Sequence, residues 1–269
     1  IFAAPGEIDD TPLFLSSSVQ PNIFFVLDDS GSMDWEVLKS NGALTVHGTG
    51  SNSGNMDFTP NNTTELRELC VGYNVMAYNP KAKYSPWSGL DEDDQQYSNK
   101  TLTTALNNPY DNDDTDNLES HFYTIWSDAG ETGVYEDGEC PDDFDAIDTD
   151  GNDTISEAEC EAAEGCVSVD DLDANLQTNY ANWYTYYRKR EYVAKRALSE
   201  LITRSSERMG LATLHNNNTV GTPIANVDDI TLPISATAAT AKKTLLRQLF
   251  RVNSTGGTPL RQRDRKSVV

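Results

Sequence analysis

The sequence predicts an α/β protein whose sheet carries helices on both faces. The first observation is an apolar run, Ile23-Phe24-Phe25-Val26-Leu27, which is typical of a strand buried on both faces of a parallel sheet. The second is that helical and strand-like patterns alternate between residues 179 and 251. Polar residues follow the first run, at the carboxyl end of the predicted strand, where open α/β sheets bind ligands.

The amino-terminal part is predicted to hold an extended leader and the first strand. We expect the leader over residues 1–20, because Pro5 and Pro21 act as breakers, and the strand over 22–28. Residues 37–178 lack sustained periodicity and are rich in Asn, Ser, Gly, Thr and Asp. An unstructured loop of that length is abnormal in a compact domain, so we interpret it as an irregular, partly structured inserted subdomain.

Regular patterns return at residue 179. Apolar residues at helical spacing predict one long amphipathic helix that ends near Arg208, with its aromatic stripe packed in the core. Residues 21–36 and 179–269 would then form a discontinuous α/β core. After the helix we expect a strand at 209–214, a turn-rich link containing Asn216-Asn217-Asn218 and Gly221, an edge strand at 230–234 and a helix at 237–251.

Charge is distributed unevenly along the chain, whose net charge is −23. Residues 91–173 hold 27 Asp or Glu and one basic residue, Lys100, whereas residues 179–269 hold 15 Lys or Arg and six acids. Phosphate binding needs basic surface, so this balance argues against a nucleic-acid partner and favours cation binding or a solvated acidic surface. No apolar run is long enough to predict a membrane span.

Four cysteines allow three pairings into two disulfides, and disulfides indicate an oxidising compartment. We prefer disulfides to free thiols. The cysteines form no Cys-x-x-Cys pair and no histidine lies near them in sequence, so the pattern does not indicate a zinc site. The three histidines are scattered and are interpreted as structural or surface residues. The residues concerned are Cys70, Cys140, Cys160 and Cys166, and His47, His121 and His215.

The first candidate metal site follows the first strand. Asp28, Ser30 and Ser32 offer one carboxylate and two hydroxyls at alternate positions, the hard oxygen ligands that Mg²⁺, Mn²⁺ or Ca²⁺ prefers. The alternative is a strand-to-helix loop whose serines cap a helix. A complete site needs a ligand from a distant loop, and Thr258 in Gly256-Gly257-Thr258-Pro259-Leu260 is the candidate. Thr258 could instead serve as an N-cap before Pro259.

The second candidate metal site lies in the acidic block, over residues 148–159. The spacing matches positions 1, 3, 5, 7, 9 and 12 of an EF-hand-like calcium loop, and Ile155 takes the apolar position 8. Asp153 replaces the usual glycine at position 6, which strains the turn without forbidding it. The alternative is a disordered acidic loop. The predicted calcium ligands are Asp148, Asp150, Asn152, Thr154, Ser156 and Glu159, with an entering helix that contains Phe144 and Ile147 and an exiting helix over 156–164.

These pieces together resemble the amino-terminal region of the type IV pilus tip-associated proteins, the PilY-type adhesins. The Asp-x-Ser-x-Ser spacing resembles the metal-ion-dependent adhesion site of von Willebrand factor A domains, and the other segments make the resemblance more specific. The segments are Pro12-Leu13-Phe14-Leu15 to Pro21-Asn22, Leu27-Asp28-Asp29-Ser30-Gly31-Ser32-Met33, Gly72-Tyr73-Asn74, Tyr78-Asn79-Pro80, Tyr84-Ser85-Pro86-Trp87, Asn182-Trp183-Tyr184-Thr185-Tyr186-Tyr187-Arg188 and Gly256-Gly257-Thr258-Pro259-Leu260-Arg261.

The resemblance implies a von Willebrand A-like, Rossmann-type core and a protein exported through the periplasm to the pilus tip at the cell surface. It implies a non-enzymatic role in pilus assembly, adhesion and surface sensing, with Asp28, Ser30, Ser32 and Thr258 as metal ligands. Minor pilins, other tip proteins, and host or abiotic surfaces are the expected partners, bound through a carboxylate. Family members usually continue into a carboxyl-terminal β-propeller, and a full von Willebrand A domain supplies a further Asp on a later strand. We therefore expect either a fragment or a sheet that another polypeptide completes.

Two other classes of function are weighed against this one. A metal on Asp and Ser oxygens could serve a hydrolase, but the sequence places no candidate base or nucleophile beside Asp28. A structural pilus-tip subunit with a vestigial metal motif is the other alternative.

Overall fold

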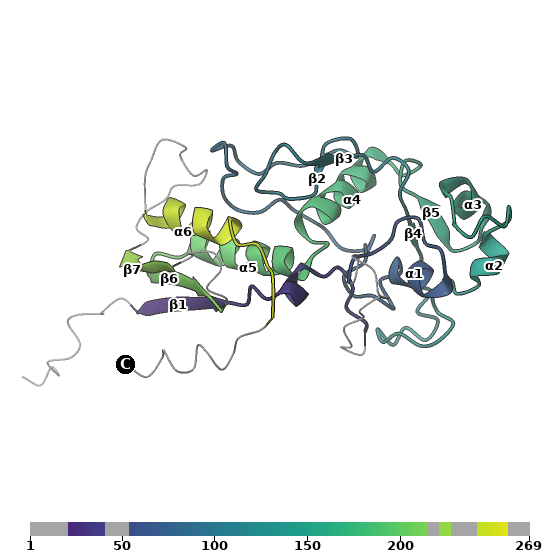
Figure 1. Ribbon diagram of the computed structural model, residues 1–269, viewed down its shortest axis with the longest axis horizontal. Coiled ribbons are helices and arrows are strands. Elements are labelled where there is room, and N and C mark those ends of the chain that lie inside the picture. Colours follow the sequence, from purple (N-terminus) through teal and green to yellow (C-terminus); the bar gives the residue numbers. More distant parts are fainter. Residues whose placement is uncertain (1–20, 41–53, 215–220, 227–240, 258–269) are drawn as a thin grey trace, which may run out of the picture.

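The computed structural model describes residues 21–40, 54–214, 221–226 and 241–257, which form a mixed α/β structure with small sheets and several helices (Figure 1). The largest sheet has the strand order β1-β6-β7, with β1 at Asn22–Leu27, β6 at Arg208–Thr213 and β7 at Gly221–Asn226. β1 and β6 run parallel, and β7 runs antiparallel to β6. This confirms the predicted strands at 22–28 and 209–214 to within a residue.

Two helices cover one face of this sheet. They are α5 (Arg190–Arg204) and α6 (Ala241–Phe250), and they pack on each other and on the side chains of β1 and β6. The shared core contains Leu27, Met209, Leu211, Ile202, Leu245 and Leu249, with Ile23 and Phe25 packed against it. The helix predicted at 237–251 is therefore confirmed over Ala241–Phe250.

The prediction that β1 is buried on both faces is wrong for the described part of the chain. Phe24 and Val26 are 49% and 57% exposed, while Ile23, Phe25 and Leu27 alternate with them and face the core. Successive side chains of a strand point to opposite faces, so the helices α5 and α6 can bury only every second residue. No described helix covers the second face of this sheet.

The single helix predicted from 179 to 208 is also wrong, because the chain forms two helices there. α4 spans Ala174–Tyr186, and α5 starts at Arg190. The amides of Tyr187 and Arg188 both donate to the Trp183 carbonyl, at 2.9 and 3.0 Å, which ends α4. Helical periodicity in the sequence continues across this break because both helices bury apolar stripes.

The chain after β6 differs from the prediction as well. Gly221, which we expected in a turn-rich link, begins β7 instead. Pairing with β6 supplies the backbone hydrogen bonds that this segment needs, and a register irregularity between Met209 and Leu211 accommodates it. The edge strand predicted at 230–234 and the leader at 1–20 lie outside the described residues.

A second hydrophobic core is built around α4 by the segments between residues 54 and 172. It includes the aromatic stripe of α4, as predicted, together with Leu66, Tyr78, Phe122 and Ile155. The short elements around it are α1 (Thr63–Glu68), β2 (Ala105–Leu106), β3 (Thr115–Asp116), β4 (Phe122–Thr124), α2 (Phe144–Ile147), α3 (Glu157–Ala162) and β5 (Cys166–Ser168), with β2–β3 and β4–β5 as antiparallel pairs. Residues expected to form an irregular insertion thus have a packed interior of their own.

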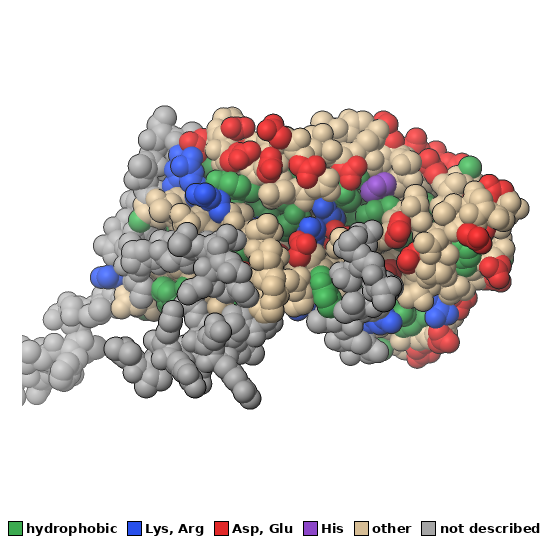
Figure 2. Space-filling model, viewed as in Figure 1, with side chains coloured by type: hydrophobic (Ala, Val, Ile, Leu, Met, Phe, Trp, Pro, Cys, Tyr) green, Lys and Arg blue, Asp and Glu red, His purple; other side chains and the backbone are tan. Residues whose placement is uncertain are grey.

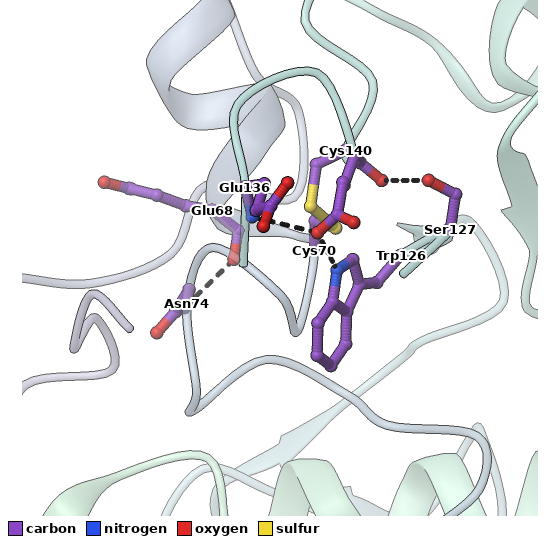
Figure 3. The surroundings of a disulfide bond; sticks show 8 residues. Glu68, Cys70, Asn74, Trp126, Ser127, Glu136 and Cys140 are labelled. Carbon is purple, nitrogen blue, oxygen red and sulfur yellow. Dashed lines mark hydrogen bonds between the residues drawn. A yellow bond between two sulfur atoms is a disulfide. The ribbon is translucent and has the colours of Figure 1, made fainter. Parts of the chain in front are cut away.

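Two disulfides restrain this second core, Cys70–Cys140 and Cys160–Cys166. The first joins residues 70 positions apart, so it closes a long loop between α1 and the acidic block. Trp126 and Ser127 lie beside it, and Asn74 donates to the Glu68 carbonyl on its other side (Figure 3). The structure thus selects one of the three pairings that the sequence leaves open.

Arg188 joins the two cores at the break between α4 and α5. Its side chain is 4% exposed and forms an ion pair with Glu36, with 2.8 Å between Arg188 Nε and Glu36 Oε1. The same guanidinium donates to the carbonyls of Leu106, Tyr184 and Asn107. Burial acts to lower the pKa of Arg188, but Glu36 together with Tyr184 and Tyr192 outweighs burial, and the pKa is raised. Among the described helices, none has the length and apolar character needed to cross a bilayer.

Replacing Arg188 with Leu is expected to lower the free energy of unfolding by about 3–5 kcal/mol, because it leaves the Glu36 carboxylate buried without its partner. The double variant Arg188→Leu/Glu36→Leu should recover part of that loss. Arg196→Leu breaks a more exposed pair with Glu200 and should cost less than about 1 kcal/mol. Urea unfolding of the four proteins measures this, and equal losses for Arg188→Leu and Arg196→Leu would contradict it.

The free energy of unfolding should fall as the pH is lowered from about 6.5 to about 4, partly because of His121. Burial lowers the pKa of His121 to about 4, whereas the unfolded chain titrates near 6.5. The unfolded state therefore binds the extra proton in this window, and acid favours unfolding. His121→Gln removes that contribution, so its unfolding free energy should depend less on pH over this range. If the unfolding free energy of His121→Gln depended on pH as steeply as that of the wild type, His121 would not be the cause.

Candidate functional site

The first candidate site is the loop that follows β1. The Ser30 amide donates to Asp28 Oδ1 at 2.9 Å, and the hydroxyl oxygens of Ser30 and Ser32 lie 3.4 Å apart. Ser30 is buried and precedes a short 3-10 helix, η1 (Gly31–Asp34), but its hydroxyl makes no capping hydrogen bond there. The structure therefore does not support Ser30 as a helix cap. The two hydroxyl oxygens lie close enough to contact the same metal ion.

A distant segment lies directly against this loop. The Gly31 amide donates to the Gly256 carbonyl at 2.8 Å, and the Thr255 amide donates to the Asp29 carbonyl at 2.9 Å. A Cβ atom at Gly31 would lie 3.1 Å from the Gly256 oxygen, so a glycine suits this close approach. The structure thus brings the predicted second loop to the first one. Thr258 itself lies outside the described residues.

The first turn of α5 holds both loops. Lys189, which precedes the helix, forms an ion pair with Asp34 at 2.8 Å, and Arg190 donates to the Ser32 carbonyl at 2.9 Å. The Glu191 carboxylate accepts from the Ser254 amide at 2.7 Å. Three consecutive residues of one helix start therefore set the positions of two segments that are more than 200 residues apart in sequence.

A buried ion pair completes this arrangement. Lys195 and Glu191 are 1% and 3% exposed and contact each other one helical turn apart. Lys195 also donates to the carbonyls of Phe250 and Val252, at 3.0 and 2.6 Å, just before the second loop. Burial lowers the pKa of Lys195, and the Glu191 carboxylate opposes this effect. The pair supplies hydrogen-bond partners to backbone groups of residues 250–254. Without these partners, the burial of those polar groups would be costly.

Sequence reasoning missed these positioning residues. We interpreted the basic residues between the apolar positions of residues 179–208 as part of an amphipathic pattern only. A usable signal exists, because Arg188-Lys189-Arg190-Glu191 is a dense charged run beside aromatic residues, at the point where the helix breaks.

The second candidate site is the acidic loop between α2 and α3. Carboxylate oxygens of Asp148, Asp150 and Glu159 all lie within 4.8 Å of one another, so these acidic groups could hold a metal ion. The predicted entering and exiting helices are present as α2 and α3. A second acidic group, Glu157, Glu161 and Asp170, which we did not predict, meets the same distance criterion.

Glu159 organises the acidic loop. Its side chain accepts hydrogen bonds from the amides of Thr149 and Ser156, at 2.8 and 2.9 Å. The hydrogen bonds with Ser156 lower the pKa of Glu159 to about 2, so the carboxylate is ionised at neutral pH. The three other predicted ligands, Asn152, Thr154 and Ser156, make local hydrogen bonds: Thr154 donates to Asn152, and the Ser156 hydroxyl takes part in a capping box.

The backbone of the acidic loop matches two details of the prediction. Asp153 has φ = +61°, the left-handed conformation that a glycine normally supplies at this position. Ile155 is fully buried, and its amide donates to the Pro60 carbonyl at 3.0 Å. The loop is therefore anchored to the segment before α1.

Comparison with known proteins gives one match of note. The chain is similar to the type IV pilus biogenesis factor PilY1 of Pseudomonas aeruginosa (strain UCBPP-PA14), with 28% identity over 201 residues. The similarity covers 71% of this chain and 15% of the length of that relative. No protein-family model matches the chain, and no solved structure matches it. The comparison supports a distant relationship to PilY-like proteins.

Glu191→Ala is expected to loosen both loops of the first candidate site, because it removes the acceptor for Ser254 and leaves the Lys195 ammonium buried without its carboxylate. Hydrogen exchange should speed up in residues 29–34 and 250–257, with a smaller effect in α1. Glu200→Ala breaks two partly exposed ion pairs on the same helix, with Arg196 and Arg204, and serves as the control. Similar exchange in the two variants would show that Glu191 does not hold these loops.

Proposed function

We propose that the loop after β1 and the segment from 254 to 258 together form a metal-ion-dependent adhesion site. Asp28, Ser30 and Ser32 would hold Mg²⁺, or Ca²⁺ or Mn²⁺, with Thr258 as a further ligand. The single observation that carries the proposal is the hydrogen bond from the Gly31 amide to the Gly256 carbonyl. It joins the two loops that the sequence pattern pairs, two residues away from Thr258.

The residues of this site suit binding. Asp28 supplies a carboxylate, and the paired hydroxyls supply neutral oxygens, so the site does not neutralise a divalent ion completely. The bound ion would supply an open coordination position for a carboxylate of a partner. The contacts from α5 hold both loops before any partner arrives, which reduces the ordering cost of binding.

The biological role that we propose is non-enzymatic. The chain would act as an adhesion and assembly factor of a type IV pilus, exported to the cell surface at the pilus tip. Minor pilins, other tip proteins and surface ligands would be its partners. The similarity to a pilus biogenesis factor supports this role, and the two disulfides suit an oxidising compartment outside the cytoplasm.

The acidic loop is proposed as a separate calcium site. Asp148, Asp150 and Glu159 would provide carboxylates to Ca²⁺, which would tie α2 to α3. Extracellular calcium modules bind at about 10⁻⁴–10⁻³ M, and we expect this loop to fall in that range. The Cys160–Cys166 disulfide lies in the exiting part of the motif and would restrain it further.

The two metal sites should separate in a titration. Asp28→Ala is expected to abolish Mg²⁺ binding at the adhesion loop and leave Ca²⁺ uptake by the acidic loop intact, because the carboxylates concerned belong to different elements. Asp148→Asn should do the reverse. Isothermal titration calorimetry with each metal on both variants and the wild type measures this.

Three outcomes would count against these assignments. Unchanged Mg²⁺ binding in Asp28→Ala would refute the adhesion site, and unchanged Ca²⁺ binding in Asp148→Asn would refute the calcium site. A wild-type protein that binds no Mg²⁺ at all would match the alternative of a structural subunit with a vestigial motif.

A further inference from the structure

The segment 78–87 carries part of the resemblance to pilus proteins, yet the proposed metal site gives it no role. This segment is a rigid loop against α4. The Tyr84 amide donates to Asn179 at 2.9 Å, and Asn179 donates in turn to the Ala82 carbonyl at 2.9 Å. Asn182 donates to the Tyr84 carbonyl at 3.1 Å. The loop therefore holds its shape without a bound partner.

A groove of about 600 Å³ runs between this loop and the amino-terminal half of α4. None of the side chains that line it is acidic, and two of them are lysines. The loop contributes Pro80, Lys81 and Lys83 to the lining, and α4 contributes Asn175 and Leu176. The groove combines ammonium groups, amide groups and the apolar surfaces of Pro80 and Leu176.

This composition stands out against its surroundings. Residues 54–173 contain 30 Asp or Glu and only four Lys or Arg, and Asp and Glu side chains are spread over the visible surface around β2, β3, α2 and α3 (Figure 2). Arg67, one of the four, is paired with Asp142. Lys81 and Lys83 are exposed, and neither takes part in an ion pair with another described residue.

We propose that this groove binds an acidic segment of a partner polypeptide. Lys81 and Lys83 would pair with its carboxylates, and the side-chain amide of Asn175, which also lines the groove, offers a hydrogen-bond donor. The lysines would attract the carboxylates of a segment bound in the groove, and this attraction acts over about 8 Å at physiological ionic strength. The loop is fixed by α4, so little conformational entropy is lost on binding.

A labelled decaglutamate peptide tests the proposal by fluorescence anisotropy, in about 150 mM NaCl with excess EDTA. EDTA removes divalent ions, so the result does not depend on either proposed metal site. The wild-type protein should bind the peptide although both carry net negative charge. Lys81→Gln/Lys83→Gln should weaken binding by about tenfold or more.

The matched control is Arg208→Gln/Arg251→Gln, which removes the same charge from exposed residues on β6 and after α6. Its affinity should equal that of the wild type, and circular dichroism should show that both double variants are folded. Absence of peptide binding to the wild type, or an equal loss in the control, would overturn the proposal. Lysine-dependent binding of heparin without binding of decaglutamate would also overturn it, in favour of a sulfated glycan.

Discussion

The start of α5 is the feature on which the rest of the candidate adhesion site depends. A pair of loops from opposite ends of the chain can form one site only if something holds their backbones together. Glu191 and Lys195 do this from inside the protein, where each charge offsets the cost of burying the other and both bind backbone groups near the second loop. Arg190 holds the first loop from the same helical turn. The positions of the two loops thus depend on α5 as much as on β1, the strand that leads into the first loop.

A comparable device joins the two hydrophobic cores. Arg188 lies at the break between α4 and α5, one residue before the residues that hold the loops, and it binds carbonyl groups on the second core. The acidic part of the chain is therefore packed against the α/β part through buried, satisfied charges.

The sequence predicted those parts of the fold that leave a local pattern. The strand ending at Leu27 and the helix at 241–250 follow from apolar spacing, and the helices flanking the acidic loop follow from its EF-hand-like pattern. The break at Tyr187 could not be predicted from periodicity, because α4 and α5 both bury apolar stripes and the turn depends on hydrogen bonds to Trp183. The exposed face of β1 escaped prediction because an apolar run does not show what covers it. For the candidate site, the sequence offered candidate ligands, but the buried pair that positions the loops could not be predicted, since burial of Lys and Glu is a tertiary property.

We propose that Asp28, Ser30, Ser32 and Thr258 surround one divalent ion. Crystals grown with Mn²⁺ test it most directly, because anomalous scattering locates that ion independently of any assumption about ligands. We expect an anomalous peak at the loop after β1, within coordination distance of oxygens from both loops. Anomalous density confined to residues 148–159, with Thr258 turned away from Asp28, would contradict it.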